Sequence, residues 1–191
     1  MAWKLVLYGS EETSKVRIIM LNFVFVIAIL GGYGYWVDFV PSSEWAGIGF
    51  NLAIAATILF VSTYYFALAI GRAKFQPKTS MPTKILAITL LPFLAFLLFF
   101  LAITHGSGDI ATQVFGHDTK LTTELSKEQR HSKRGCEYHL KGYAIEKALP
   151  DHICVSKAEF DTLPKTGEYT LQVEQTPLGV HIKHIAPAIN R

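Results

Sequence analysis

Residues 85–103 read ILAITLLPFLAFLLFFLAI, and this stretch decides the fold of the chain. It holds no ionisable side chain, and its length is close to the roughly 20 residues that a helix needs to cross the hydrocarbon core of a bilayer. Two comparable apolar runs precede it, at residues 16–36 and 46–70. The sequence therefore predicts a membrane α-helical domain at residues 16–104, with three transmembrane helices.

The charges indicate how these helices are oriented. The net charge is +3, and the chain from residue 105 onward balances its acidic and basic residues, so the excess belongs to the first half. Loop 37–44 between the first two runs carries acidic residues and no basic ones. Cytoplasmic loops of membrane proteins are rich in Lys and Arg. The basic residues of the first half are Lys4, Lys15, Arg17, Arg72, Lys74, Lys78 and Lys84.

This pattern predicts a cytoplasmic or interfacial N-terminal segment at residues 1–15 and an extracytoplasmic C-terminal half. The chain is compact and shows no eukaryotic sorting signal, so we expect a multi-pass protein of a bacterial inner membrane with a periplasmic domain. The neutral second half has no Lys/Arg-rich face, which makes nucleic acid an unexpected partner.

Small residues recur at four-residue spacing on the first two runs, at Ala28 and Gly32 and again at Gly49 and Ala53. Such spacing lets two helices approach closely in a membrane. We therefore expect the first two helices to pack as a tight hairpin. The first run ends in GGYGYW at residues 31–36, which is predicted to be a flexible, aromatic helix end.

Residues 105–134 are predicted to be a polar connector, because Gly and charged residues are frequent there. Within it, residues 118–133 are compatible with a short helix that carries Leu121 and Leu125 on one side.

From Cys136 onward, apolar and polar residues alternate, which is typical of half-buried strands. Ser156 and Glu159 stand in the spacing of a capping box, which opens a helix. We expect a small extracytoplasmic α+β domain at residues 135–191, in the order β-β-α-β-β. Its strands are expected near residues 136–146, 152–155, 169–174 and 180–185.

The two cysteines of the chain, Cys136 and Cys154, both lie in this small domain. A domain of this size buries little apolar surface and often needs a covalent cross-link. If the domain faces an oxidising compartment, a Cys136–Cys154 disulfide is expected.

A metal site is the alternative use of the same residues. Cys136 with His139, and His152 with Cys154, offer the two thiols and two imidazoles that zinc or copper prefers. Strand alternation, however, predicts that Cys136 and His139 lie on opposite faces. No other cofactor is expected.

No nucleophile elbow, phosphate-binding glycine loop or zinc-protease motif is present, so we do not expect an enzyme. The function expected is that of an accessory, assembly or toxin-immunity protein, whose outward domain meets a protein partner or a second copy of the chain. A metal-binding module is one alternative. A small transporter or channel subunit is another, although the apolar cores lack the ionisable residues that ion pathways use.

Overall fold

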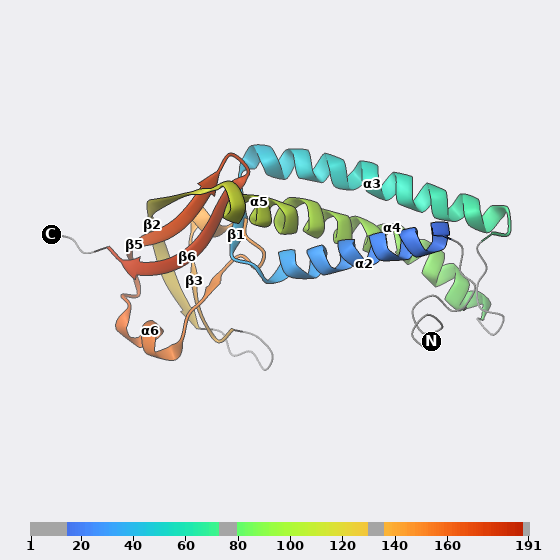
Figure 1. The fold of residues 1–191 in the computed structure, drawn as a ribbon. Helices are drawn as coiled ribbons and strands as arrows, with labels where there is room; N and C mark the ends of the chain where they lie inside the picture. Colours follow the sequence, from blue (N-terminus) through green and yellow to red (C-terminus); the bar gives the residue numbers. More distant parts are fainter. Residues whose placement is uncertain (1–14, 73–79, 130–135, 189–191) are drawn as a thin grey trace, which may run out of the picture.

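The computed structural model describes residues 15–72, 80–129 and 136–188. Three long apolar helices run side by side from a sheet at one end of the molecule (Figure 1). They are α2 (Lys15–Trp36), α3 (Ser43–Ala69) and α4 (Met81–Phe100), and all are long and apolar enough to span a membrane. The interfacial segment expected before residue 15 and the basic residues Lys74 and Lys78 lie outside the described residues.

The third helix continues far beyond its expected end at residue 103. After α4 the chain forms a π-helix, η1 (Leu101–Ser107), and then α5 (Gly108–Phe115), so that one helical path of 35 residues runs from Met81 to Phe115. Gly106, Ser107 and Gly108 of the predicted connector are helical, and only Gly116, in an extended conformation, ends the helical path. Ser107 donates its hydroxyl to the carbonyl of Ile103 (2.6 Å), and the glycines allow close packing against neighbouring elements.

The prediction that the first two helices pack as a tight hairpin is wrong. Helices α2 and α3 pack mainly against α4 and η1, which lie between them (Figure 1). Ala28 and Gly32 face outward, and a Cβ added to Gly32 would meet nothing within 4 Å. The close approach of α2 instead uses Gly34. Gly49 and Ala53 of α3 are buried, with Gly49 against Thr104 of η1.

The C-terminal region contains an antiparallel sheet of six strands in the order β1-β6-β5-β2-β3-β4. The strands are β1 (Phe39–Pro41), β2 (His117–Gln129), β3 (Tyr138–Lys141), β4 (Ile153–Cys154), β5 (Thr166–Thr176) and β6 (Gly179–Pro187). A 3-10 turn, η2 (Tyr143–Ile145), follows β3, and α6 (Lys157–Thr162) lies between β4 and β5.

The expected β-β-α-β-β order describes only part of this sheet. Residues 117–129, assigned to the connector and in part to a helix, form β2, which pairs with β5 over ten positions from His117↔Gln175 to Ser126↔Thr166. Leu121 and Leu125 are four residues apart, a spacing that shares one face of a helix and also one face of a strand. The threonines of this segment favour the strand.

The loop between α2 and α3 supplies β1, so the sheet also takes a strand from the helical half of the chain. β1 pairs with β6 from Phe39↔His181 to Pro41↔Gly179. The sheet therefore cannot be separated from the bundle at residue 135.

The remaining strands fall close to their expected positions, and the capping box of Ser156 and Glu159 opens α6. Tyr169, Leu171 and Val173 of β5 are buried, as the alternation predicts. The strand expected at residues 136–146 is shorter and ends at Lys141.

The sheet is curled around its core. Val40 of β1 and Ile153 of β4 stand in strands at opposite edges, yet both belong to the same buried cluster as Leu140 and Leu171. Residues of β4, the second half of β6 and Asp38 all line the cleft described below, so these edges of the sheet face each other.

Candidate functional site

Three features lie on the sheet and where it meets the helices: a buried hydrogen-bond network, a cluster of cysteines and histidines, and a cleft. The network, called here the junction cluster, consists of Tyr33, Asp109, Gln113 and His181. Asp109 of α5 is fully buried. It accepts hydrogen bonds from the Tyr33 hydroxyl (2.5 Å) and the Gln113 amide (2.6 Å), and its other oxygen lies 2.7 Å from Nδ1 of His181.

The junction cluster joins two helices and the sheet through one carboxylate. Hydrogen bonding to Asp109 raises the pKa of His181, against the opposing effect of burial; Glu174 and Asp38 raise it further. Partial desolvation raises the pKa of Asp38, an otherwise exposed residue in the loop between α2 and β1. A carboxylate paired with a histidine and two neutral donors is a satisfied buried charge, which fixes the relative positions of the elements that carry it.

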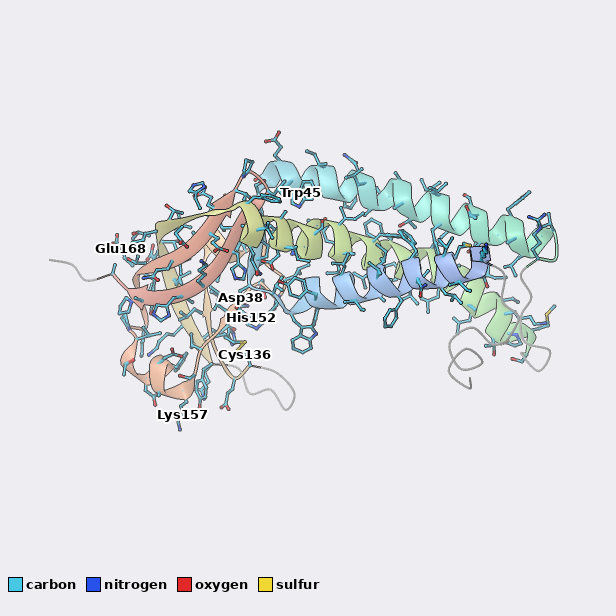
Figure 2. The ribbon with its side chains drawn as sticks, viewed as in Figure 1. Asp38, Trp45, Cys136, His152, Lys157 and Glu168 are labelled. Carbon is cyan, nitrogen blue, oxygen red and sulfur yellow. A yellow bond between two sulfur atoms is a disulfide. The ribbon has the colours of Figure 1, made fainter. Side chains whose placement is uncertain are left out.

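The π-helix lies directly beside this cluster. Trp45, near the start of α3 (Figure 2), donates its indole N–H to the carbonyl of Thr104 in η1 (3.0 Å). His105 is buried between the rings of Phe39 and Phe100, at centroid distances of 6.4 and 5.8 Å. Widened helical turns of this kind are frequent at functional sites.

Hydrogen bonds also hold the α2–α3 loop against the β5–β6 turn. The backbone N–H of Ser42 donates to Leu178 and its hydroxyl donates to Pro177, both at 2.8 Å. The hydroxyls of Thr112 and Thr176 lie 2.7 Å apart. These contacts and the junction cluster hold the sheet on the bundle at several points.

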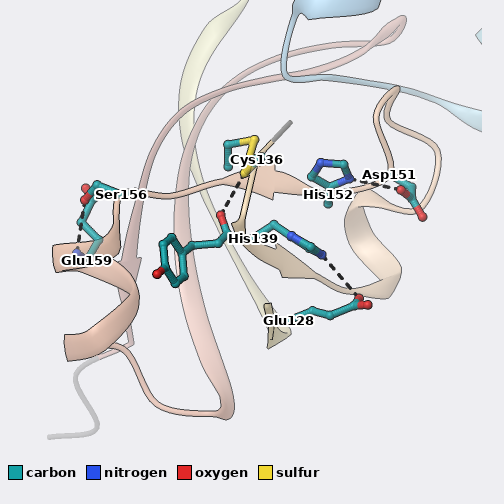
Figure 3. Close-up of a disulfide and its surroundings, with 9 residues drawn as sticks. Glu128, Cys136, His139, Asp151, His152, Ser156 and Glu159 are labelled. Atoms are coloured by element: carbon teal, nitrogen blue, oxygen red, sulfur yellow. Dashed lines mark hydrogen bonds and ion pairs between the residues drawn. A yellow bond between two sulfur atoms is a disulfide. The ribbon is translucent and has the colours of Figure 1, made fainter. Parts of the chain in front are cut away.

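The second feature, called here the cysteine–histidine cluster, consists of Cys136, His139, His152 and Cys154 (Figure 3). Cys136 and Cys154 form a disulfide with a Cα–Cα distance of 5.7 Å. Three atoms that could bind a metal ion lie within 4.8 Å of one another, and they belong to Cys136, His152 and Cys154.

His139 lies beside this group, although strand alternation placed it on the face opposite Cys136. Its ring centroid is 4.7 Å from that of His152, and the residue is only 2% exposed. The expectation fails because Cys136 precedes β3, which begins at Tyr138, so the alternation of the strand does not apply to it.

Each histidine of the cluster has one ring nitrogen near a carboxylate. Nδ1 of His152 lies 3.3 Å from Asp151, and Nε2 of His139 lies 3.6 Å from Glu128 (Figure 3). Lys141 lies 3.3 Å from Glu128 and 3.5 Å from Asp151. Lys141 lowers the pKa of Glu128, whereas the pKa of Asp151 is lowered mainly by the hydrogen bond with His152 and less by Lys141. Burial, with a smaller effect of His152, lowers the pKa of His139, which favours the neutral imidazole.

The third feature is a cleft of about 430 Å³ between two edges of the curled sheet. One wall consists of residues 153–155 around β4, together with Glu159, Thr162 and Leu163 in and after α6. The other wall consists of residues 182–187 of β6, and Asp38 also lines the space. A cavity of this size is large enough for a small ligand or a short peptide segment.

Comparisons with known proteins do not assign a function to these three features. No protein-family model, curated protein or solved structure matches the chain.

The sequence identified the cysteine–histidine cluster but not the junction cluster. Cys136 and Cys154 stand out because the chain contains no other cysteine. Tyr33, Asp109 and His181 come together only through the fold, since Asp109 and His181 are 72 residues apart. The available signal was Asp109 itself, a carboxylate shortly after a membrane-length apolar run, where ionisable residues usually have a specific role.

Proposed function

We propose that this protein is a non-enzymatic binding subunit of a bacterial inner membrane, which holds a rigid sheet domain on the extracytoplasmic side for a protein partner. The partner belongs to a membrane complex, or is a toxin that the protein neutralises. The observation that carries this proposal is the cleft, because it combines a concave surface with a strand edge that is not paired with any other described strand.

The free edge belongs to the second half of β6. Among the described strands, β6 pairs with β1 only at residues 179–181, and beyond them the backbone N–H of Ile182 donates to Asp38 (3.0 Å). From Lys183 to Pro187, the described part of the chain supplies β5 as the only strand partner. An extended segment of another protein can pair with such an edge through main-chain hydrogen bonds.

The walls of the cleft carry groups that can select such a segment. Ile153, Ile182 and Ile185 supply apolar surface, while Glu159 and Lys183 supply charges of opposite sign. Main-chain pairing gives affinity, and the alternate side chains of the bound segment contact these walls. The cleft therefore suits a partner that presents an exposed strand of mixed polarity.

The helices support the anchoring part of the proposal. Large apolar side chains are exposed along all three of them, including Phe25, Leu59 and Phe93. Trp36, which is 80% exposed, stands at the sheet end of α2, where an interfacial aromatic residue belongs. Lys15 and Arg72 stand at the opposite end of the bundle, which the positive-inside rule assigns to the cytoplasm.

Two asparagines favour a partner inside the membrane as well. Asn22 of α2 and Asn51 of α3 are exposed on the surface of the bundle, and neither side chain hydrogen-bonds to the described residues. An amide that faces hydrocarbon without a partner is unfavourable, and such side chains commonly bond to neighbouring helices. They mark faces where helices of another subunit or a second copy are expected to pack.

Affinity purification in mild detergent from the native membrane tests this function. We expect the tagged chain to recover a stoichiometric protein partner. Thr162→Trp, which places a large ring in the cleft, should reduce that recovery about ten-fold, the equivalent of about 1.4 kcal/mol.

Asp161→Trp is the matched control, since Asp161 is exposed on the same short helix but does not line the cleft. It should recover the partner as the unmodified chain does. Equal recovery by the Thr162→Trp variant would show that the cleft is not the binding site. A chain that purifies alone and monodisperse would contradict the binding function itself.

A further inference from the structure

The cysteine–histidine cluster contains more polar side chains than a disulfide requires. A structural disulfide needs two cysteines at bonding distance, whereas here two histidines and two carboxylates surround it. We propose that, when the disulfide is reduced, Cys136, Cys154 and His152 bind a thiophilic divalent cation of the Zn²⁺ type, with His139 as the fourth ligand.

The first support is the distance between the ligand atoms. The sulfurs of Cys136 and Cys154 and a ring nitrogen of His152 already lie within 4.8 Å of one another. Zinc–sulfur bonds are about 2.3 Å long and zinc–nitrogen bonds about 2.0 Å, so ligand atoms around one ion stand about 3 to 4 Å apart. Small movements would bring these atoms around a common centre once the two sulfurs separate.

The second support is independent of the cysteines. Nδ1 of His139 is buried and has no hydrogen-bond partner among the described residues. A buried polar nitrogen without a partner is unfavourable and calls for an explanation. The centroid of this ring lies 4.7 Å from that of His152, but His139 is not among the residues whose ligand atoms lie within 4.8 Å of one another, so Nδ1 would bind the cation only after the His139 side chain moves toward it.

The third support is the position of the two carboxylates. A histidine that binds a metal commonly directs its other ring N–H to a carboxylate, which fixes the tautomer and the orientation of the ring. Asp151 faces Nδ1 of His152 and leaves its Nε2 as the ligand atom. Glu128 faces Nε2 of His139 and leaves its Nδ1. In both histidines, therefore, one ring nitrogen faces a carboxylate and the other is left to bind the cation.

The change between the two states is a balanced thiol–disulfide exchange. A dithiol reductant transfers two electrons and two protons to the Cys136–Cys154 bond, which opens to two thiols while the reductant becomes a disulfide. Binding of the cation then releases the two thiol protons to solvent. The disulfide and the metal site exclude each other, so the domain has one cross-link in either state.

Cobalt(II) titration of the purified full chain in detergent tests this inference, with Co²⁺ as a spectroscopic substitute for Zn²⁺. After reduction with a phosphine, the chain should bind one Co²⁺ and show the thiolate charge-transfer and intense d–d bands of a tetrahedral site. Added Zn²⁺ should displace the Co²⁺. The oxidised chain should show neither band.

Variants separate this site from adventitious binding. His152→Ala should abolish the tetrahedral spectrum, and Asp151→Asn should weaken Co²⁺ binding about ten-fold. His117→Ala is the control, because His117 is an exposed histidine at the start of β2 that lines neither the cluster nor the cleft. If the reduced chain takes up no Co²⁺, or if His152→Ala binds it as well as His117→Ala, the inference is wrong. The comparison of reduced and oxidised wild type needs no substitution and does not depend on the partner proposed above.

Discussion

Asp109 shows how one buried residue can connect two parts of a chain. Its carboxylate is fully buried where α5 meets β6, and it is contacted by Tyr33, Gln113 and His181. If one partner of a buried ion pair is removed, the charge of the other is left uncompensated. The resulting loss of stability exceeds the net contribution of the intact pair. The stability of the junction should therefore respond to the protonation of His181.

The contribution of His181 to stability should decrease as the pH rises. Its pKa is raised from 6.5 in the folded state, mainly by the hydrogen bond with Asp109, with Glu174 and Asp38 acting in the same direction. A histidine with a raised folded-state pKa contributes fully below its unfolded pKa, and the contribution is lost as the pH rises through the folded pKa.

Thermal unfolding of wild type and His181→Gln in detergent between pH 6 and 9 measures this effect. The variant should be less stable at pH 6, and the difference in Tm should shrink as the pH increases. His184→Gln, on the same strand, should follow the wild type. A difference that stays constant across this range would mean that protonation of His181 does not stabilise the junction.

The disulfide should also make a measurable contribution to stability. Cys136 and Cys154 are 18 residues apart, and a loop of this size corresponds to about 3 kcal/mol of stabilisation through the unfolded state. The double variant Cys136→Ser/Cys154→Ser should lose about this free energy of unfolding in denaturant titrations made without metal. A reductant should destabilise the wild type and leave the double variant unchanged. An unaffected wild type would contradict a structural role for the bond.

At the scale of elements, the π-helix η1 determines how closely α2 approaches the third helix. A Cβ on Gly34 would stand 2.6 Å from the Gly106 nitrogen and the Leu101 oxygen, so only glycine fits there. Widened turns are usually retained where packing or function requires them. Here the wide turn brings the carbonyl of Thr104 to Trp45 and sits beside the junction cluster.

Gly34→Ala should destabilise the bundle by about 1 to 3 kcal/mol, because it overpacks this contact. Gly32→Ala is the matched control: its added Cβ meets nothing within 4 Å. Thermal unfolding in detergent should separate the two variants clearly. If Gly34→Ala is as stable as Gly32→Ala, then α2 does not pack against η1 through Gly34.

The elements that the sequence predicted are those specified by local patterns. Apolar length identifies the three helices, and the capping box of Ser156 identifies the start of α6. β1 and β2 were not predicted, since each depends on pairing with a distant segment. Phe39 pairs with His181 and Leu121 with Leu171, and no local pattern records such partners. The polar surface of β2 further resembles that of a solvated helix.

The same distinction applies to the candidate sites. Cys136, His139, His152 and Cys154 were identified because the chain has no other cysteines and the spacing is compact. The position of His139 beside the disulfide was not predicted, because Cys136 lies before β3 and the alternation of the strand does not apply to it. The junction cluster and the cleft each combine residues from both halves of the chain, so only the fold brings them together.

At the scale of the whole molecule, the helices and the sheet are connected at several points. The 35-residue path from Met81 to Phe115 leads from the bundle to the start of β2, an interior strand of the sheet, and β1 returns from the bundle to pair with β6. A partner held at the cleft would therefore be held at a fixed position relative to the bilayer. This arrangement suits a subunit that positions another protein at the membrane surface.

The central claim is that the three helices cross the membrane and carry the sheet domain to the extracytoplasmic side. Fusions of alkaline phosphatase, which is active only outside the cytoplasm, test it most directly. A fusion after Arg191 should be active, and a fusion after Arg72, at the end of α3, should be inactive. A fluorescent reporter that folds only in the cytoplasm should give the opposite pattern. An inactive phosphatase together with a fluorescent reporter after Arg191 would contradict the account.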